Sequence, residues 1–587
     1  MRLKPITEPW YVQALDRLRE HLAHAEALLP LALVGLISGL LTGAVVIAFR
    51  WLTEHAQIML TPIAGPEAFE GLPWSYRLAL PIAGGLLIGV IFQRASVGSR
   101  EVGVVHVMER LAYHSGRMPW KNAALQFFGA ALSIMSGHSV GREGPVVHVG
   151  AASSSLLGQW LGFPNNSIRV LVACGAAASI AASFNTPTAG VMFAMEVVLM
   201  EYTLVGFTPV ILAAVAATSL ARVAYGPAPA FDIPIMQMTS LWELPYILLV
   251  GVLVGAAAAL FIQGIRSLDV CCREIPLWMR TTAAGLVTGL CGLIAPEVMG
   301  IGYDTVELTL LGEMALGALV TVAAVKLVAT VACISLGLPG GLIGPTLVMG
   351  AAAGGALGVV GHAMVPDMSS SEGFFAMLGM GATMGATLQA PLAALMAVLE
   401  LTANSNSILP GMFAIVTATL TTHVLFKKRS VYINMLQARG LDYRNDPVAV
   451  SLRRTGVGAI MERRLLALPR RIDASALPQP EPPAEWALLT EDDRVSAVLP
   501  WDALEKFMAD FVAGKEISEE LDLLEIQGAQ QAFDMVRIHA TLAEAIERMD
   551  RSGAQVVLVT GSDHPVPGNV YGVLTRDRIE AGVRYRT

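Results

Sequence analysis

The chain has 587 residues, of which 54% are hydrophobic and only 15% are charged, whereas soluble domains carry about 25% charged residues. The last 137 residues contain 22 acidic and 16 basic side chains, or 28%, while the first 450 contain 48 charged residues, or 11%. This division excludes one large soluble enzyme and predicts a membrane body followed by a soluble tail. The net charge of −8, without a long basic run, gives no reason to expect nucleic acid as a partner.

The first 27 residues are predicted to form an N-terminal cytoplasmic helix. A helix that crosses a bilayer needs about 20 apolar residues. Six later segments meet this requirement: Leu28–Leu52, Tyr76–Ala95, Glu243–Ile265, Trp278–Val298, Ala318–Leu336 and Ile408–Phe426.

Between these spans lie apolar segments that are shorter and broken by glycine and proline. They are Gly144–Leu161, Ile168–Ser183, Thr188–Met200, Gly344–Gly361, Phe374–Ala386 and Pro391–Thr402. We expect each to be too short to cross a bilayer alone. Interrupted helices at membrane depth are tolerated only where they are buried in protein or line a water-filled cavity. Pairs of such segments in two halves of a membrane protein indicate a binding site for a transported solute.

The broken segments occur twice, which indicates an internal duplication. The sequence from Ser183 to Met192 matches that from Thr387 to Met396 at an offset of 204. Upstream, Gly144–Ala152 lies over Gly344–Ala352 at an offset of 200, with the Gly-Pro start in both. Two matches in the same order at nearly the same offset exceed what chance supplies. The sequence alone leaves open whether the two halves are parallel or inverted.

Each half contains a helix start suited to an anion. The first start is Gly141-Arg142-Glu143-Gly144-Pro145 and the second is Gly341-Leu342-Ile343-Gly344-Pro345. Glycine lets backbone approach closely, and proline suits the first helical turn, where its missing N–H costs nothing. Helix N-termini attract anions through their free N–H groups and positive dipole end. Two such starts at mid-membrane would bind an anion weakly enough to release it.

Glu143 places a carboxylate at one of these anion-attracting helix starts. It could cap its own helix, or it could compete with the anion for the same place. Ionisable residues inside a membrane are rare and functional by default. We therefore interpret Glu143 as the external gate, which protonation or a rival anion displaces.

These motifs resemble the CLC family of chloride channels and chloride/proton antiporters, over roughly Leu28 to Gln437. Gly-Arg-Glu-Gly-Pro is a specific signature of that family, and Gly341–Pro345 resembles its Gly-x-Phe-x-Pro motif. Tyr432 matches the family tyrosine whose hydroxyl faces the central anion. The resemblance implies an all-α multi-pass membrane protein with an inverted repeat of tilted, partly re-entrant helices. It also implies a homodimer with one pathway in each subunit.

Three departures from the family pattern bear on mechanism. Where the family has Gly-Ser-Gly-Ile-Pro, the sequence contains Val102-Gly103, so one hydroxyl donor to the anion is missing; a register through Gly98-Ser99 is the alternative. Val197 stands where coupled antiporters often carry an inner proton-relaying glutamate, and the neighbouring Glu196 more plausibly serves structure. Ile343 stands in the place of the phenylalanine of the family's Gly-x-Phe-x-Pro motif, which forms an aromatic part of the pathway wall.

The tail is predicted to contain a pair of CBS-like modules. The second module has a strand–helix–strand–strand–helix pattern, which runs from Ile538 to a helix beginning at Asp577. The first module is shorter and is split across Val457–Met461 and Trp486–Met508, with a proline-rich loop at Pro478–Pro483 where a helix would be expected. Nucleotide-binding CBS modules usually carry an aspartate where this chain has Arg578 and Ala503. We therefore expect a dimerising, regulatory platform that binds no adenine nucleotide.

These observations combine into one prediction. The domains are 1–27, a first membrane repeat at 28–237, a second at 238–445 and the cytoplasmic CBS-like pair at 446–587. We expect the protein to lie in the cell membrane. Arginine and lysine beside the first and last spans indicate that both termini face the cytoplasm. The lipid bilayer, a small anion and, in one mode, protons are the expected partners.

The expected activity is chloride transport that is not enzymatic and needs no cofactor or metal. Because of Val197, we expect passive, channel-like or weakly coupled transport gated by Glu143. The alternative is a chloride/proton antiporter whose inner proton route uses water or another residue. Fluoride export is a lesser alternative, because relatives with that activity usually depart from the Gly-Arg-Glu-Gly-Pro pattern.

Overall fold

The computed structural model describes residues 10–24, 27–60, 68–366, 369–441, 447–473, 483–514, 520–526, 530–561 and 566–584. The chain divides into two compact units. One comprises Met1–Leu31, Gly158–Ile168 and Asn445–Thr587, and the other comprises Ala32–Leu157 and Arg169–Arg444.

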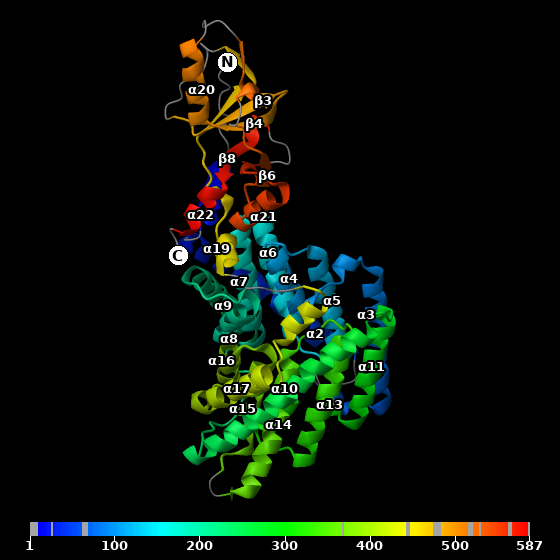
Figure 1. Ribbon diagram of the computed structural model, residues 1–587. Coiled ribbons are helices and arrows are strands. Elements are labelled where there is room, and N and C mark those ends of the chain that lie inside the picture. The colour runs from blue at the N-terminus through cyan, green and yellow to red at the C-terminus, as the bar shows by residue number, and fades with distance from the viewer. Residues whose placement is uncertain are drawn as a thin grey trace. The chain divides into compact units, whose positions relative to one another are not determined.

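The helical unit is built from two successive sets of helices (Figure 1). The first set contains α2 (Leu28–Leu60), α3 (Trp74–Arg94), α4 (Gly103–Tyr113), α5 (Trp120–Met135), α6 (Glu143–Trp160), α7 (Asn165–Phe184), α8 (Pro187–Phe193) and α9 (Leu204–Tyr225). The second contains α10 (Leu244–Cys272), α11 (Leu277–Ile294), α12 (Tyr303–Leu310), α13 (Leu316–Ser335), α14 (Ile343–Met364), α15 (Glu372–Leu388), α16 (Pro391–Thr402), α17 (Ile408–Leu420) and α18 (Val431–Ala438).

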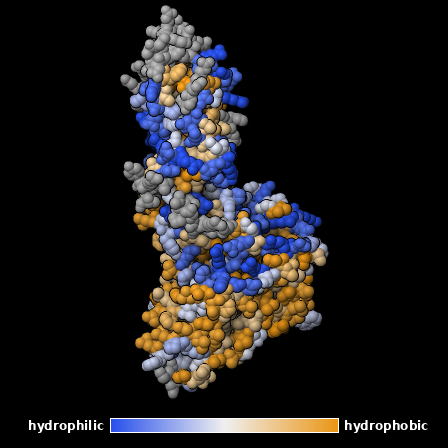
Figure 2. All heavy atoms as spheres, in the orientation of Figure 1, coloured by the Kyte–Doolittle hydropathy of each residue, from blue (hydrophilic) through white to orange (hydrophobic). Residues whose placement is uncertain are grey.

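Nine helices of the described chain are long and apolar enough to cross a membrane. All six predicted spans are among them, and a broad hydrophobic band covers the face of the helical unit seen in Figure 2. The prediction was wrong for three segments. We expected Ile168–Ser183 and Gly344–Gly361 to be too short to cross a bilayer, but they belong to α7 and α14, which have 20 and 22 residues. The span at Leu204–Tyr225 was not predicted. The predicted all-α multi-pass body is confirmed.

Repeat-related residues make reciprocal contacts between the two sets of helices. In Figure 1, α3 and α11 lie side by side. A Cβ added to Gly85 would lie 2.3 Å from the carbonyl oxygen of Thr281, and one added to Gly285 would lie 2.2 Å from that of Pro81. The offset of 200 relates Gly85 to Gly285 and Pro81 to Thr281, so each contact is the other with the two repeats exchanged. Reciprocal contacts of this kind arise around a two-fold axis, as an inverted repeat requires.

The tail unit contains two three-stranded sheets of the same topology and one two-stranded sheet. In the first, β1 (Leu465–Pro469) runs parallel to β3 (Trp486–Glu491), which pairs antiparallel with β4 (Arg494–Pro500). In the second, β6 (Phe533–Arg537), β7 (Val556–Thr560) and β8 (Val570–Thr575) repeat this arrangement. The remaining elements are α1 (Trp10–Ala23), α19 (Pro447–Arg454), β2 (Arg471–Asp473), α20 (Trp501–Gly514), β5 (Glu520–Asp522), α21 (Leu542–Ser552) and α22 (Arg576–Arg584).

The two sheets pack against each other through apolar side chains from both, including Leu488, Val498, Leu558 and Val573. Two similar three-stranded units fit the predicted pair of modules, and the small α/β tail is confirmed. Most of the predicted proline-rich loop lies outside the described residues.

Candidate functional site

The starts of α6 and α14 meet at a short antiparallel bridge between the repeat-related residues Gly141 and Gly341. The Gly141 N–H donates to the Gly341 carbonyl at 2.8 Å, and the Gly341 N–H donates to the Gly141 carbonyl at 2.6 Å. Pro145 and Pro345 lie in the first turns of the two helices. The positive ends of two helix dipoles, one from each repeat, therefore converge on one place.

The Glu143 side chain is fully buried and lies at this meeting point. A Cβ on Gly141 would come within 1.9 Å of Glu143 Oε2, and Cβ atoms on Gly341 and Gly344 would come within 2.7 and 2.9 Å of its carboxylate oxygens. Only residues without a side chain leave room for the carboxylate here. We call this space, bounded by Gly141, Gly341 and Gly344, the carboxylate seat.

One hydroxyl group contacts the seated carboxylate. The Tyr303 hydroxyl donates to Glu143 Oε1 at 2.9 Å, while Oε2 has no hydrogen-bond partner among the residues that the structure describes. Arg142 is not hydrogen-bonded to this carboxylate. Its guanidinium donates to the Ser183 carbonyl at 3.2 Å and lies over the rings of Phe184 and Tyr303.

Tyr432 lies near the start of α18 and is 3% exposed. Within the described parts of the chain its hydroxyl has no hydrogen-bond partner. A buried hydroxyl without a partner is unusual and indicates space for a ligand or water. Tyr432 lines a cavity together with Gly144, Leu342, Val102 and Gly103. Five of the predicted site residues, from the starts of four helices, therefore meet at this cavity.

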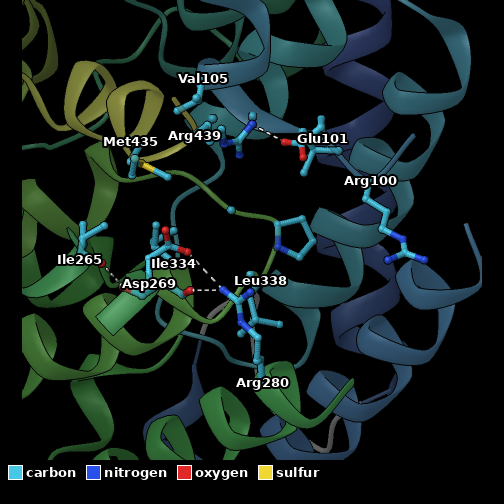
Figure 3. Close-up of a pocket in the computed structure, with 18 of the residues that line it drawn as sticks. Arg100, Glu101, Val105, Ile265, Asp269, Arg280, Ile334, Leu338, Met435 and Arg439 are labelled. Atoms are coloured by element: carbon cyan, nitrogen blue, oxygen red, sulfur yellow. Dashed lines mark hydrogen bonds and ion pairs between the residues drawn. The ribbon is translucent and has the colours of Figure 1, made fainter. Parts of the chain in front are cut away.

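This cavity has a volume of about 690 Å³ and lies within the helical unit (Figure 3). Its charged lining residues are mostly basic: Arg100, Arg266, Arg273, Arg280 and Arg439, against Glu101 and Asp269. Arg439 pairs with Glu101, and Arg280 contacts Asp269 at 3.3 Å (Figure 3). The excess of positive charge in the lining favours the entry of anions.

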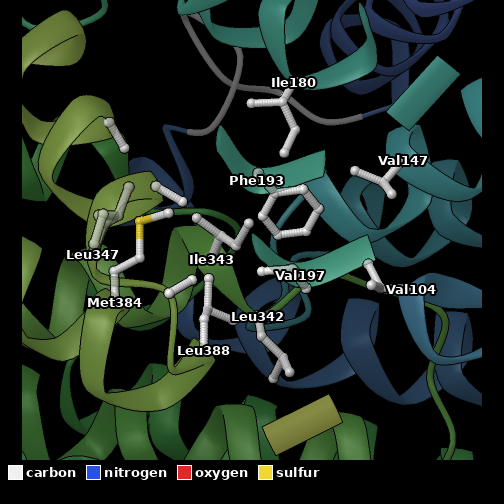
Figure 4. Close-up of a cluster of buried hydrophobic side chains, with 14 of the residues drawn as sticks. Val104, Val147, Ile180, Phe193, Val197, Leu342, Ile343, Leu347, Met384 and Leu388 are labelled. Carbon is white, nitrogen blue, oxygen red and sulfur yellow. The ribbon is translucent and has the colours of Figure 1, made fainter. Parts of the chain in front are cut away.

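Glu143 lines a second, smaller cavity of about 20 Å³. Its other lining residues are mostly apolar and include Phe184, Phe193, Tyr303 and Ile343. Figure 4 shows Ile343 among buried apolar side chains from both repeats, and Val197 belongs to the same cluster. Glu143 therefore borders the narrow, apolar cavity, while its neighbour Gly144 lines the wide one.

Val102 immediately precedes α4, whereas the alternative register would use Ser99, whose hydroxyl is engaged by Ser96 at 2.7 Å. Because Val102 lines the cavity with Tyr432, the structure favours the first register. An apolar side chain therefore stands where a hydroxyl donor was expected from the family pattern.

Glu196 and Glu400 cap helices of the opposite repeats. The Glu196 carboxylate accepts the N–H groups of Leu392 and Ala393 at 3.3 and 2.7 Å, at the start of α16. Glu400 accepts those of Thr188 and Ala189 at 2.9 and 2.8 Å, at the start of α8. The reciprocal arrangement gives Glu196 the structural role that its repeat position suggested.

Sequence reasoning missed Tyr303, which precedes the second repeat's motif by about forty residues. Its neighbours Gly300 and Gly302 mark a tight turn, but no pattern places its hydroxyl beside Glu143. Among the described residues, no group of three or more histidine, cysteine, aspartate or glutamate side chains could hold a metal ion.

The comparisons with known proteins agree with this geometry. Residues 84–423 match the family model described as voltage-gated chloride channel. A putative ClcB-like chloride channel protein of Ralstonia nicotianae is 34% identical over 404 residues, which cover 67% of this chain and 93% of the relative. An H⁺/Cl⁻ exchange transporter ClcA of Cronobacter sakazakii is 28% identical, over 70% and 90% of the two chains.

The fold likeness extends into the tail. The solved structure of a eukaryotic CLC transporter superposes with a TM-score of 0.58 at 16% identity, and the match covers 96% of this chain and 98% of that one. The family model, the bacterial relatives and the fold agree with one another. The chain therefore belongs to the CLC family of voltage-gated chloride channels and related anion transport proteins.

Proposed function

We propose that this membrane protein conducts chloride past Glu143, whose ionised carboxylate occupies the place of the anion until protonation or chloride displaces it. The observation that carries this proposal is the carboxylate seat, which lies between the starts of α6 and α14 and has no room for a side chain at Gly141, Gly341 or Gly344. A negative group already stabilised at two helix starts is a natural substitute for a negative ion.

The anion is held by partial charges in this proposal. Its ligands are backbone groups around Glu143–Pro145 and Leu342–Pro345, together with the unpartnered hydroxyl of Tyr432. The Arg142 guanidinium donates to the Ser183 carbonyl and is not one of the proposed ligands. Val102 contributes no hydrogen bond, so selectivity depends on the backbone and on one hydroxyl. Weak, distributed ligands permit both entry and release.

The mode we propose first is passive or weakly coupled transport. Val197 is 2% exposed and belongs to an apolar cluster, so it offers no group that could carry a proton from the cytoplasm. Glu196 is engaged in capping α16. A relay at this position would need a titratable side chain with access to water.

The second candidate is chloride/proton antiport. It is supported by the 28% identical relative, which is named as an H⁺/Cl⁻ exchange transporter. In that case Glu143 would carry the proton at the outer end, and the inner route would use water or a residue other than Val197.

Three further proposals follow from the family resemblance. The protein works as a homodimer with a pathway in each subunit, and both termini face the cytoplasm. The tail serves as a regulatory platform without an adenine nucleotide, because Arg578 takes the place of the ribose-binding aspartate and pairs with Glu462 at 3.0 Å.

The test is chloride efflux from liposomes containing the full-length protein, with external pH recorded at the same time. We expect chloride to leave the vesicles, and Glu143→Ala to retain the flux while losing its dependence on pH. Uphill proton movement that disappears in Glu143→Ala would select antiport over passive transport. Absence of chloride flux in both proteins would contradict the proposed function.

A further inference from the structure

Tyr303 occupies a position from which one hydroxyl controls the gate. It is the first residue of α12, and its hydroxyl donates to Glu143 Oε1 at 2.9 Å. The ring packs edge-on against Phe231 at 5.6 Å and Phe184 at 6.0 Å, and the Arg142 guanidinium lies 5.4 Å from its centre. Contacts on several sides fix the direction of the hydroxyl.

The backbone that carries Tyr303 is held by a buried lysine. Lys326 on α13 is fully buried, and its ammonium donates to the carbonyls of Val298, Gly300 and Ile301 at 3.0, 2.9 and 3.1 Å. Burying a charge is costly unless it is fully hydrogen-bonded, so the three carbonyls are firmly tied to α13.

The turn between these carbonyls and Tyr303 depends on glycine. Gly302 has a φ of +85°, which other residues rarely adopt, and a Cβ there would lie 3.3 Å from the Lys326 ammonium. The chain therefore passes from the lysine-bound turn into α12 in one conformation. That conformation delivers the Tyr303 hydroxyl to the carboxylate seat.

We propose that Tyr303 is a positioning residue that latches the ionised Glu143 carboxylate in its seat, and that Lys326 and Gly302 hold the latch in place. This inference rests on the proposed gating role of Glu143. The latch stabilises the closed gate because its hydroxyl donates a side-chain hydrogen bond to the carboxylate. A protonated or displaced Glu143 no longer needs that donor.

The charged and titratable groups around Glu143 come from four elements. Arg142 precedes it, Tyr303 begins α12, Tyr432 lies on α18 and Lys326 lies on α13 behind the Gly302 turn. Arg142, Tyr432 and Lys326 are unchanged in a Tyr303→Phe variant, and the phenylalanine ring preserves the packing against Phe184 and Phe231. The substitution therefore removes one hydroxyl from the seat and leaves the other groups in place.

The expected effect is a looser gate. A hydrogen bond to a charged group contributes about 1.5–3 kcal/mol, which corresponds to roughly a tenfold to hundredfold change in an equilibrium. At neutral pH, Tyr303→Phe should lower the half-saturating chloride concentration for efflux by about tenfold or more, because chloride competes with a less firmly seated carboxylate. As pH falls and Glu143 becomes protonated, the variant and the wild type should converge.

The experiment measures chloride efflux from liposomes against chloride concentration and pH for four proteins: wild type, Tyr303→Phe, Glu143→Ala and the double variant. Tyr246→Phe is the matched control, since its hydroxyl donates to the Leu357 carbonyl at 2.6 Å, away from the seat, and its ring also packs edge-on against a phenylalanine. We expect Tyr303→Phe to act in the wild-type background and to have no effect when Glu143 is absent.

The latch would be refuted by unchanged half-saturation in Tyr303→Phe, by a rise in place of a fall, or by an equal change in the Glu143→Ala background. The last result would mean that the hydroxyl serves structure alone. Failure of the proposed function is distinguishable, because wild type and Glu143→Ala would then both lack chloride flux.

Discussion

Gly141→Ala tests the carboxylate seat with the smallest possible change. The nearest atoms to a Cβ at this position all belong to the Glu143 side chain, with Oε2 at 1.9 Å, the carboxyl carbon at 2.8 Å and Oε1 at 3.1 Å. Ordinary contact begins at 3.4 Å, so the carboxylate must move by about 1.5 Å. The end of a flexible side chain can make that movement, whereas backbone could not.

The displacement should separate the carboxylate from the Tyr303 hydroxyl, which now lies at 2.9 Å. A lost hydrogen bond to a charged group costs about 1.5–3 kcal/mol. We expect Gly141→Ala to flatten the pH dependence of chloride flux and to weaken flux in the Glu143→Ala background as well, because the methyl group then occupies the place of the anion.

The assay is chloride efflux from liposomes across a range of pH, accompanied by thermal unfolding in detergent. Gly317→Ala is the matched control, because a Cβ there meets no atom within 4 Å. Helical alanine is favoured over glycine by about 0.5–1 kcal/mol, so the control should be as stable as the wild type or slightly more so. A Gly141→Ala protein with the pH response and flux of the wild type would refute the reasoning.

Four other substitutions address the anion ligand, the repeat caps and the tail. Tyr432→Phe should raise the half-saturating chloride concentration about threefold to tenfold, since one hydrogen bond contributes about 0.5–1.5 kcal/mol; unchanged half-saturation in the efflux assay would exclude that hydroxyl as a ligand. Glu196→Ala and Glu400→Ala should each lower the free energy of unfolding by about 1–2 kcal/mol, as for a lost helix cap; normal thermal unfolding with altered proton coupling in Glu196→Ala would instead indicate a proton relay. In the tail, burial raises the pKa of Glu462, but hydrogen bonds from Arg464 and the charges of Arg578 and Arg464 outweigh it and hold that pKa below its usual range. A lowered pKa stabilises the folded tail above the ordinary glutamate pKa, and this contribution is lost as pH falls through the depressed value. The free energy of unfolding of the tail should therefore fall more between neutral and acid pH in wild type than in Glu462→Gln, and an equal fall in both proteins would contradict the prediction.

The duplication made the centre of the site predictable from sequence. Glycine and proline mark where α6 and α14 begin, and their equal spacing in two halves implies that the starts meet. Tyr303 could not be found in this way. Its hydroxyl reaches Glu143 through the turn at Gly302, which Lys326 holds from a helix more than twenty residues away. Such a contact depends on packing between elements and leaves no periodic signal.

The helix lengths were misjudged because glycine was interpreted as a break. In α14 and α15, Gly350 and Gly379 instead let two helices touch: a Cβ on Gly350 would lie 2.4 Å from the Gly379 carbonyl oxygen, and one on Gly379 would lie 2.2 Å from that of Gly350. Close approach requires glycine without interrupting either helix. A sequence shows the glycines, but only the packed structure distinguishes a crossing point from a break.

The most direct test of the central claim is to locate the anion itself. Structures of wild type and Glu143→Ala, determined in bromide with its anomalous signal, would show whether the anion and the carboxylate share one place. We predict a bromide peak in Glu143→Ala between Gly141, Gly341 and Gly344, where the wild type holds its carboxylate. A variant whose seat stays empty while bromide binds elsewhere would contradict the account.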